Sequence, residues 1–198
     1  MSQVTAVFYT QAHRIEGDLR VVERLSEKLN DPLTDFIEIR SARVVNLLQG
    51  DADPGIMWPV VTIPKAAILL ATLDMQNHES GQTRIDKLRP KTDSQVGVIV
   101  GSIEVYGTGH LQCHGDPTRV LTSQLQSFLP ITDATILLSQ RQSDNCIVTN
   151  LALINRSMIR AFTLSIETNG LAARTNPLVS ANEGSPPSGS GRHYSLAG

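Results

Sequence analysis

The sequence predicts a mainly β protein with short helices, an α+β fold made as a tandem duplication of a small bent antiparallel sheet or half-open barrel, with one covering helix per unit. Apolar residues alternate with period two in both halves of the chain, as they do in strands with one buried face. The strand patterns are not separated by amphipathic helices long enough to form right-handed crossovers, which argues against a parallel α/β fold.

Several blocks of sequence recur in the same order in the two halves, at a nearly constant offset. Such recurrence is typical of an internal repeat. We therefore predict a first β-rich unit over residues 1–74, a linker over 75–95, a second unit over 96–167 and a disordered tail over 168–198. The matched blocks are "EGDL" with "TGHL", which aligns Gly17 with Gly109, "FIEIRSARV" with "FLPITDATI", and "IPKAAI" with "INRSMI".

The first unit is predicted to run strand, strand, helix, strand, strand, strand. Apolar residues alternate in the strands and recur one turn apart in the helix. Gly17 in this unit, like Gly107 and Gly109 in the second, lies inside a strand pattern and indicates a bend or bulge, since glycine otherwise weakens a strand. The predicted elements are strands at 4–8 and 15–21, a helix over 22–29 that "NDP" ends, strands near 36–48 and 59–63, a turn at Pro64 and Lys65, and a last strand from Ile68.

The second unit repeats this order. Strands are predicted at 96–100 and 105–113, and Asp116 and Pro117 are a suitable N-cap and first residue for the following helix. If the units are copies, matched residues should be buried at equivalent sites. The pairs expected to be buried together are Leu25 with Leu121, Phe36 with Phe128, and Ile68 with Ile159.

Composition describes an ordinary globular chain and narrows the possible partners. The net charge is −2, so no overall positive field would attract nucleic acid or an anionic membrane. The N-terminus lacks a secretory signal pattern, and no apolar run is long enough to span a bilayer. With only two cysteines and no motif-like spacing between them, we expect a cytoplasmic protein with reduced thiols.

Four stretches of the first unit, "RIEGDLRV", "ERLSEKLN", "FIEIRSARV" and "VTIPKAAI", cover most of residues 14–68. They resemble an uncharacterised bacterial domain family with the pattern Gly-x-Leu, Arg-Leu-Ser-x-x-Leu-Asn, Phe-Ile-x-Leu and Asn-Lys-x-x-Ile. The second unit keeps the last block as "INRSMI" but lacks the Leu-Ser-x-x-Leu-Asn order. The resemblance implies no activity. The strand–turn–strand close is also similar to the end of Sm-like and other SH3-like barrels, an analogy of fold that transfers no function.

Four basic residues occupy similar places in the two units and are the candidate binding residues. Arg24 and Arg119 lie near the predicted helices, and Lys65 and Arg156 lie in the matched turns. Together they could hold an anion or an acidic partner, with arginine making bidentate contacts. The alternative interpretation is a solvated surface with local carboxylate pairs.

One cluster, "HLQCHGD", raises the possibility of a metal site or a nucleophile, because it gathers His110, Cys113, His114 and Asp116. The structural interpretation is favoured. Cys113 is in phase with the apolar face of its strand, where free cysteine acts as a small hydrophobe, and Asp116 has a role as an N-cap. We therefore predict no catalytic residue, no metal and no cofactor.

The function predicted is a non-enzymatic interaction, scaffold or regulatory module that binds a protein partner or itself. The repeat, the absence of a polar catalytic constellation and the tail favour it. An Sm-like RNA-binding protein is the alternative, which the sparse aromatics and the acidic balance oppose. A metal-dependent or cysteine hydrolase is a second alternative. The two units are expected to meet through apolar strand edges, which would otherwise be prone to aggregation.

Overall fold

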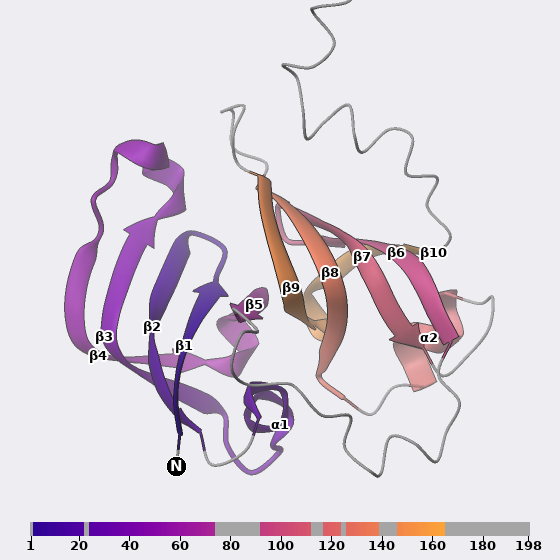
Figure 1. Cartoon of the computed structure of the whole chain (residues 1–198), viewed down its shortest axis with the longest axis horizontal. Coiled ribbons are helices and arrows are strands. Elements are labelled where there is room, and N and C mark those ends of the chain that lie inside the picture. The colour runs from indigo at the N-terminus through magenta and orange to yellow at the C-terminus, as the bar shows by residue number, and fades with distance from the viewer. Residues whose placement is uncertain are drawn as a thin grey trace, which may run out of the picture. The chain divides into compact units, whose positions relative to one another are not determined.

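The computed structural model describes residues 2–21, 24–73, 92–111, 117–123, 126–138 and 146–164. All strands in these ranges belong to one ten-stranded antiparallel sheet (Figure 1). Its strand order is β10-β6-β7-β8-β9-β5-β1-β2-β3-β4.

The N-terminal half, residues 2–73, contributes five consecutive strands and one short helix. Leu25 and Leu29, one turn apart, are the buried residues of that helix, and Lys28 donates a backbone hydrogen bond to the Arg24 carbonyl in its first turn. The elements are β1 Ser2–Tyr9, β2 His13–Val21, α1 Leu25–Asn30, β3 Phe36–Asn46, the 3-10 helix η1 Leu47–Ala52, β4 Ile56–Pro64, the 3-10 turn η2 Lys65–Ala67, and β5 Leu70–Leu73.

The C-terminal half, residues 92–164, repeats this order of elements. In both halves the first strand pairs with the second and the fifth, the second with the third, and the third with the fourth. The elements are β6 Thr92–Val100, β7 Ile103–Leu111, α2 Pro117–Ser123, β8 Phe128–Leu138, β9 Cys146–Asn155, the 3-10 turn η4 Arg156–Met158, and β10 Ile159–Leu164.

The predicted fold class was wrong. We expected an α+β protein of two small sheets or half-open barrels, each with a covering helix, whereas the strands form one continuous sheet and the protein is mostly β. The α-helices of the described residues are only six and seven residues long. The physical reason is that β5 and β9 pair edge to edge, so neither half closes on itself.

Two of the three predicted bend glycines, Gly17 and Gly107, lie at equivalent bulges, whereas Gly109 is regularly paired. The register shifts at Gly17 between β2 and β3, and at Gly107 between β7 and β8. Gly17 therefore corresponds to Gly107 and not, as predicted, to Gly109. Facing these glycines, Ser41 and Asp133 both adopt φ 49°, a left-handed backbone that single bulge residues use. The two halves thus bend at the same point of the same strand pair.

The two halves meet at what we call the seam, the pairing of β5 with β9. Leu70 lies opposite Ile154 and Leu73 lies opposite Leu151, and all four are at most 2% exposed. In Figure 1, β5 lies between β1 and β9. The halves do meet through apolar strand edges, but residues 1–166 form one compact unit and not the two separate units that we predicted.

Each half also places side chains in the core of the other. The core around α1 and β1–β5 includes Phe128, Leu151 and Leu153 from the C-terminal half. The core around β6–β9 includes Leu69 and Leu70 from the N-terminal half. Burial across the seam is therefore reciprocal, and neither core is complete without the other half.

Asn30 and Asn155 stabilise the seam through hydrogen bonds to backbone groups of the other half. Asn155 is 4% exposed and its Nδ2 donates to the Ile68 carbonyl at 2.8 Å, while its backbone N–H donates to the Leu69 carbonyl at 2.9 Å. On the other side, the Asn30 Oδ1 accepts the Phe128 N–H at 2.8 Å. Each side chain thereby satisfies buried backbone groups that the sheet leaves unpaired.

The prediction of equivalent buried pairs was wrong for one member of each pair. Phe128 is 2% exposed but Phe36 is 55% exposed, and Ile68 is fully buried whereas Ile159 is only partly buried. Leu25 and Leu121 differ in the same way. The buried members, Leu25, Ile68 and Phe128, belong to the core that the seam completes. In the part of the chain that the structure describes, the seam therefore occurs once, and the matching surfaces at the two ends of the sheet have no neighbouring strand.

The predicted boundaries between the units need one adjustment. β6 begins at Thr92, so residues 92–95 are strand and not linker. The rest of the predicted linker, residues 75–91, and the predicted tail, residues 168–198, lie outside the described residues. None of the described helices has the length and apolar character needed to cross a membrane.

Candidate functional site

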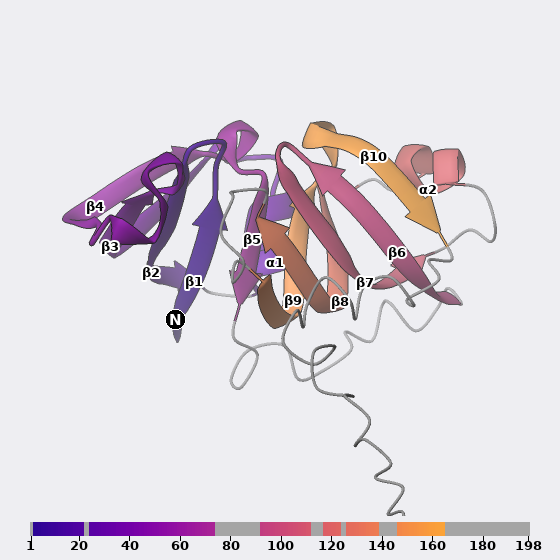
Figure 2. The same cartoon turned by 90° about the horizontal axis from the view of Figure 1, so that it is seen from above.

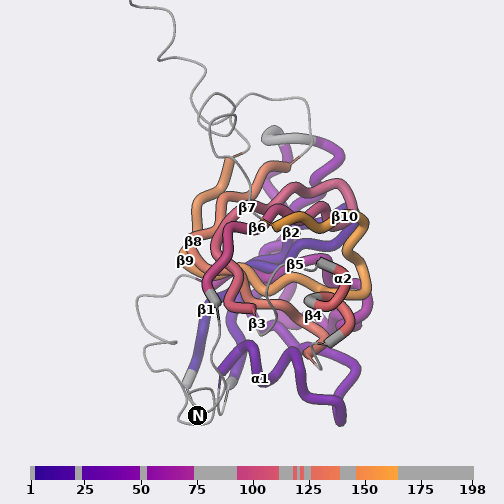
Figure 3. The backbone as a smooth tube through the Cα atoms, turned by 90° about the vertical axis from the view of Figure 1, so that its right-hand side faces the viewer, coloured from indigo at the N-terminus to yellow at the C-terminus, as the bar shows by residue number. Residues whose placement is uncertain are grey.

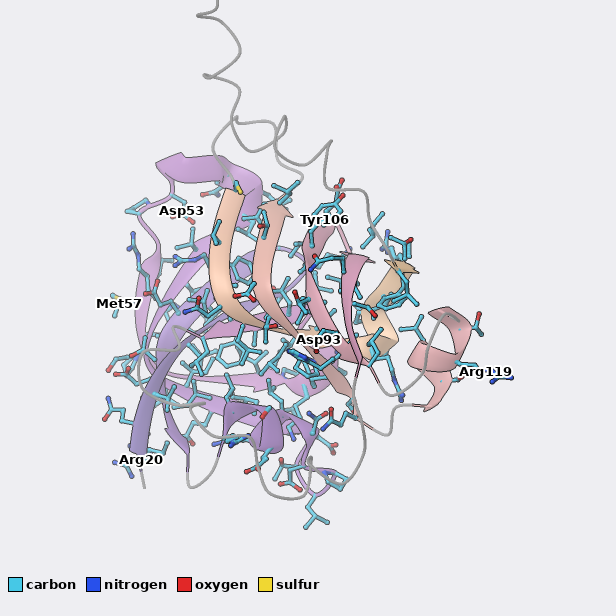
Figure 4. The ribbon with its side chains drawn as sticks, turned by 45° about the vertical axis from the view of Figure 1, so that its right-hand side comes forward. Arg20, Asp53, Met57, Asp93, Tyr106 and Arg119 are labelled. Carbon is cyan, nitrogen blue, oxygen red and sulfur yellow. The ribbon has the colours of Figure 1, made fainter. Side chains whose placement is uncertain are left out.

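Among the described residues, the first open edge of the sheet is β4, which pairs there with β3 alone. Its residues Ile56, Met57, Trp58 and Val60 are between 48% and 65% exposed. Figure 4 shows Met57 on the outer side of the sheet. Phe36, opposite Pro64 in the β3–β4 pair, extends this apolar surface. We call these five residues and the open backbone of β4 the β4 edge.

Such an edge is unusual in a protein that remains free. An open strand offers unpaired N–H and C=O groups to any passing strand, and proteins normally protect it with charges, prolines or a covering segment. The β4 edge carries large apolar side chains without a lysine between Ile56 and Val60. Of its two prolines, Pro64 removes an N–H from the open side, whereas Pro59 lies opposite the bulge at Ser41 on β3. Clustered exposed apolar side chains mark interaction surfaces.

The second open edge is β10, whose one neighbour within the described ranges is β6. A groove of about 340 Å³ runs between this strand and α2, and its lining includes Leu121, Thr122, Ile159 and Ala161. Figures 2 and 3 show α2 beside β10. We call the strand and this groove the β10 edge.

A second hollow, of about 480 Å³, lies beside the seam and is lined from β1, β2, β5 and β9. Its carboxylate, Glu16, is held by Arg14 at 2.8 Å. The remaining polar lining is threonine and asparagine, including Thr5 and Thr149. This hollow therefore offers hydroxyl and amide groups rather than an acid–base pair.

Two of the four basic residues predicted to bind a partner support their own half of the structure. Lys65 is 8% exposed, and its Nζ donates to the Asp31 carbonyl at 2.8 Å and to Thr34 Oγ1 at 2.9 Å. Burial lowers the pKa of this ammonium below its usual value, against the opposing effect of Asp31. Arg156 occupies the equivalent turn and donates to the Leu121 carbonyl at 3.2 Å. Both side chains anchor a 3-10 turn to the region of the neighbouring helix.

The other two basic residues lie at different places relative to their helices. Arg24 directly precedes α1 in the N-terminal half, and its backbone N–H donates to Glu27 Oε2 at 3.3 Å. Arg119 lies within α2 and is exposed, on the C-terminal half. A shared binding role for the four residues stays a prediction.

His110 lies in a chain of three polar side chains on β6, β7 and β8. Its Nδ1 is 2.6 Å from Asp93 Oδ1, and its Nε2 is 3.0 Å from Thr132 Oγ1. The Asp93 side chain is 70% exposed. Cys113, His114 and Asp116 lie outside the described residues. The ranges that are described hold no group of three or more His, Cys, Asp or Glu side chains arranged for a metal ion.

Comparison with protein-family models, curated proteins and solved structures found no match. The resemblance to a bacterial domain family therefore stays a prediction.

The loop that leads into β4 is held by a carboxylate. Asp53 Oδ2 accepts the Asn46 N–H at 2.7 Å and Oδ1 accepts the Gly55 N–H at 2.9 Å. These backbone hydrogen bonds lower the pKa of Asp53 below its usual value of 3.8. The charged carboxylate thus positions the start of the β4 edge.

We expect Asp53→Asn to lower the free energy of unfolding at neutral pH, because an amide has one acceptor oxygen for two donors. A lowered folded-state pKa contributes stability above pH 3.8 that is lost as the pH falls through the folded value. The difference between wild type and variant should therefore shrink in acid. Denaturant unfolding across a pH series measures it, with Glu38→Gln, in an exposed ion pair, as the control. A difference that is constant with pH would contradict the prediction.

Sequence reasoning missed both open edges and both seam asparagines. Pro59 and Pro64 within one strand were a usable signal, because proline in a sheet is confined to edge strands and bulges. A second signal was that Pro64 in "IPKAAI" is matched by Asn155 in "INRSMI". A proline matched by an asparagine indicates that the position has a different structural role in each half.

Proposed function

We propose that this chain is a non-enzymatic interaction module that binds protein strands by adding them to the open edges of its sheet. The observation that carries the proposal is the β4 edge, an open strand with Ile56, Met57, Trp58 and Val60 exposed. Strand addition takes affinity from main-chain hydrogen bonds and specificity from alternate side chains. The exposed aromatic Trp58 suits the latter role, since tryptophan is enriched at binding hot spots.

We also propose that the two halves arose by tandem duplication. Equal strand order, equal bulges at Gly17 and Gly107, and left-handed residues at Ser41 and Asp133 support this origin. A duplicated unit that binds its own copy by an edge already has the chemistry of a strand-binding module. The seam is then an internal example of the proposed function.

Peptide selection tests the proposed function. Random peptides displayed on phage are selected on the full-length protein and counter-selected on Val60→Lys, which places a charge on the β4 edge. We expect enriched peptides with alternating apolar residues that bind wild type and lose at least about tenfold in affinity on the variant, roughly the 1.4 kcal/mol of one good hydrogen bond. Val148→Lys, an exposed valine of β9, is the matched control and should bind normally. Peptides that bind Val60→Lys equally well, or no enrichment, would refute the proposal.

A further inference from the structure

The seam joins two different edges. It pairs the fourth strand of the C-terminal half, β9, with the fifth strand of the N-terminal half, β5. Because both halves have the same strand order, each half has its fourth strand at one edge and its fifth strand at the other. The seam uses one of each, which leaves the fourth strand of the N-terminal half, β4, and the fifth strand of the C-terminal half, β10. The two open edges are therefore complementary in kind.

We propose that the occupant of the β4 edge is the β10 edge of a second copy of this chain, paired in the register of the seam. This inference rests on the proposed function, of which it names the partner. Between the halves, positions in β4 and β9, and in β5 and β10, differ by 91 residues, as the β1–β5 and β6–β10 registers show. The expected intermolecular pairs are Ile63 with Ala161, Thr62 with Phe162, Val61 with Thr163 and Val60 with Leu164.

The side chain that enters the seam has an exposed counterpart. Phe128, at the start of β8, is 2% exposed and packs in the core that contains Leu25, Leu29 and Ile68. Phe36, at the start of β3, is its counterpart and is 55% exposed. The same aromatic residue thus lies at the same place in each half, buried where a partner edge is present and exposed where the described strands supply none.

The receiving surface has an open counterpart as well. Ile159 corresponds to the core residue Ile68, and it lines the groove of about 340 Å³ between α2 and β10 together with Leu121 of α2, the helix that corresponds to α1. In the seam, the corresponding surface receives Phe128. The groove at the β10 edge is therefore the place where Phe36 of a second copy would be buried.

One substitution makes the intermolecular contact weaker than the seam. Asn155, which donates to the Leu69 and Ile68 carbonyls, corresponds to Pro64, which has neither donor. Amide directions alternate along a strand, so the N–H groups of Thr62 and Val60 share the side on which Asn155 donates in β9. The β4 edge thus keeps the N–H groups that can pair with an added strand. It lacks the hydrogen bonds that Asn155 donates across the seam, which we call the asparagine clamp. Reversible association is expected, in contrast to the permanent seam.

An interface between two different edges is heterologous, so each added copy presents a fresh β4 edge and a fresh β10 edge. Such contacts grow into a closed ring when the rotation between copies closes, and into an open filament when it does not. The proposal therefore predicts association beyond a dimer at sufficient protein concentration.

Sedimentation velocity and light scattering across a wide range of concentrations test the proposal on the full chain. We expect wild type to associate, and Val60→Lys and Ala161→Lys each to lose association, while Val148→Lys behaves as wild type. Pro64→Asn, which restores the clamp, should lower the dissociation concentration about tenfold, equivalent to one buried hydrogen bond. Circular dichroism of each variant establishes that it is folded.

A mixing experiment separates this geometry from others. Val60→Lys keeps an intact β10 edge and Ala161→Lys keeps an intact β4 edge, so a mixture of the two should form a one-to-one dimer and nothing larger. Association of Ala161→Lys alone would overturn the proposal in favour of contact between two β4 edges. Wild type and Pro64→Asn that both stay monomeric would also overturn it. If peptides are still selected on the β4 edge in that case, the proposed function stands and only the self-association fails.

Discussion

Replacing Asn155 by leucine is expected to lower the free energy of unfolding by about 2–4 kcal/mol, since a buried backbone acceptor that loses its donor costs about 1–3 kcal/mol and a second weak bond is lost with it. The Asn155 Nδ2 donates to the Ile68 carbonyl at 2.8 Å and to the Lys65 carbonyl at 3.3 Å. Its Oδ1 also accepts the Ser157 N–H at 3.1 Å. Leucine of similar volume leaves these groups without that partner.

Urea unfolding followed by tryptophan fluorescence and by circular dichroism measures this effect. Trp58 lies in the N-terminal half, whereas Asn155 lies in the C-terminal half, so a parallel shift of both signals would show that the seam couples the halves. Asn150→Leu, an exposed position of the same strand, is the control and should change stability by less than about 0.5 kcal/mol. A fluorescence midpoint that does not move with Asn155→Leu would show that the halves unfold independently.

Gly107→Ala is expected to destabilise the protein by about 2–4 kcal/mol, because an added methyl group meets backbone that cannot move without breaking the sheet. A Cβ at this position would lie 2.7 Å from the Thr132 carbonyl oxygen and 3.1 Å from the Ala134 Cα. Gly17→Ala should behave alike, since its Cβ would lie 2.7 Å from the Arg40 carbonyl oxygen.

Gly109→Ala is the matched control on the same strand. Its Cβ would lie 3.0 Å from Val96 Cγ1 and 3.4 Å from Leu111 Cδ2, both in side chains that can rotate. Thermal unfolding of the three variants should therefore rank Gly109→Ala as the mildest. Equal losses for Gly107→Ala and Gly109→Ala would contradict the assignment of the bulge to Gly107.

The local structure could be predicted from the sequence and the assembly of the sheet could not. Alternation in β7, where buried and partly buried residues follow each other from Ile103 to Leu111, is visible in any apolar pattern. The 91-residue match of "IPKAAI" to "INRSMI" likewise locates two equivalent 3-10 turns, η2 and η4. These features depend on neighbours in the chain.

The seam depends on residues far apart, which is why the fold class was predicted wrongly. Nothing in "LATL" of β5 indicates that Leu70 lies opposite Ile154 rather than at a free edge. Phe36 and Phe128 were predicted to be equivalent for the same reason. The segments that they begin match in sequence, and their burial differs because, among the described strands, a partner edge covers Phe128 alone. The candidate site was missed for the same reason, since a strand edge becomes visible only when the whole strand order is known.

Because β5 pairs with β9, the partner strand of β5 is synthesised much later than β5 itself. β5 leaves the ribosome roughly 80 residues before β9, a delay of about 4–16 seconds at translation rates of about 5–20 residues per second. During that interval the strand that covers Leu70 and Leu73 in the folded protein has not yet been synthesised. An unpaired strand edge can pair with another nascent chain on the same messenger RNA before the chain's own C-terminal half has been synthesised.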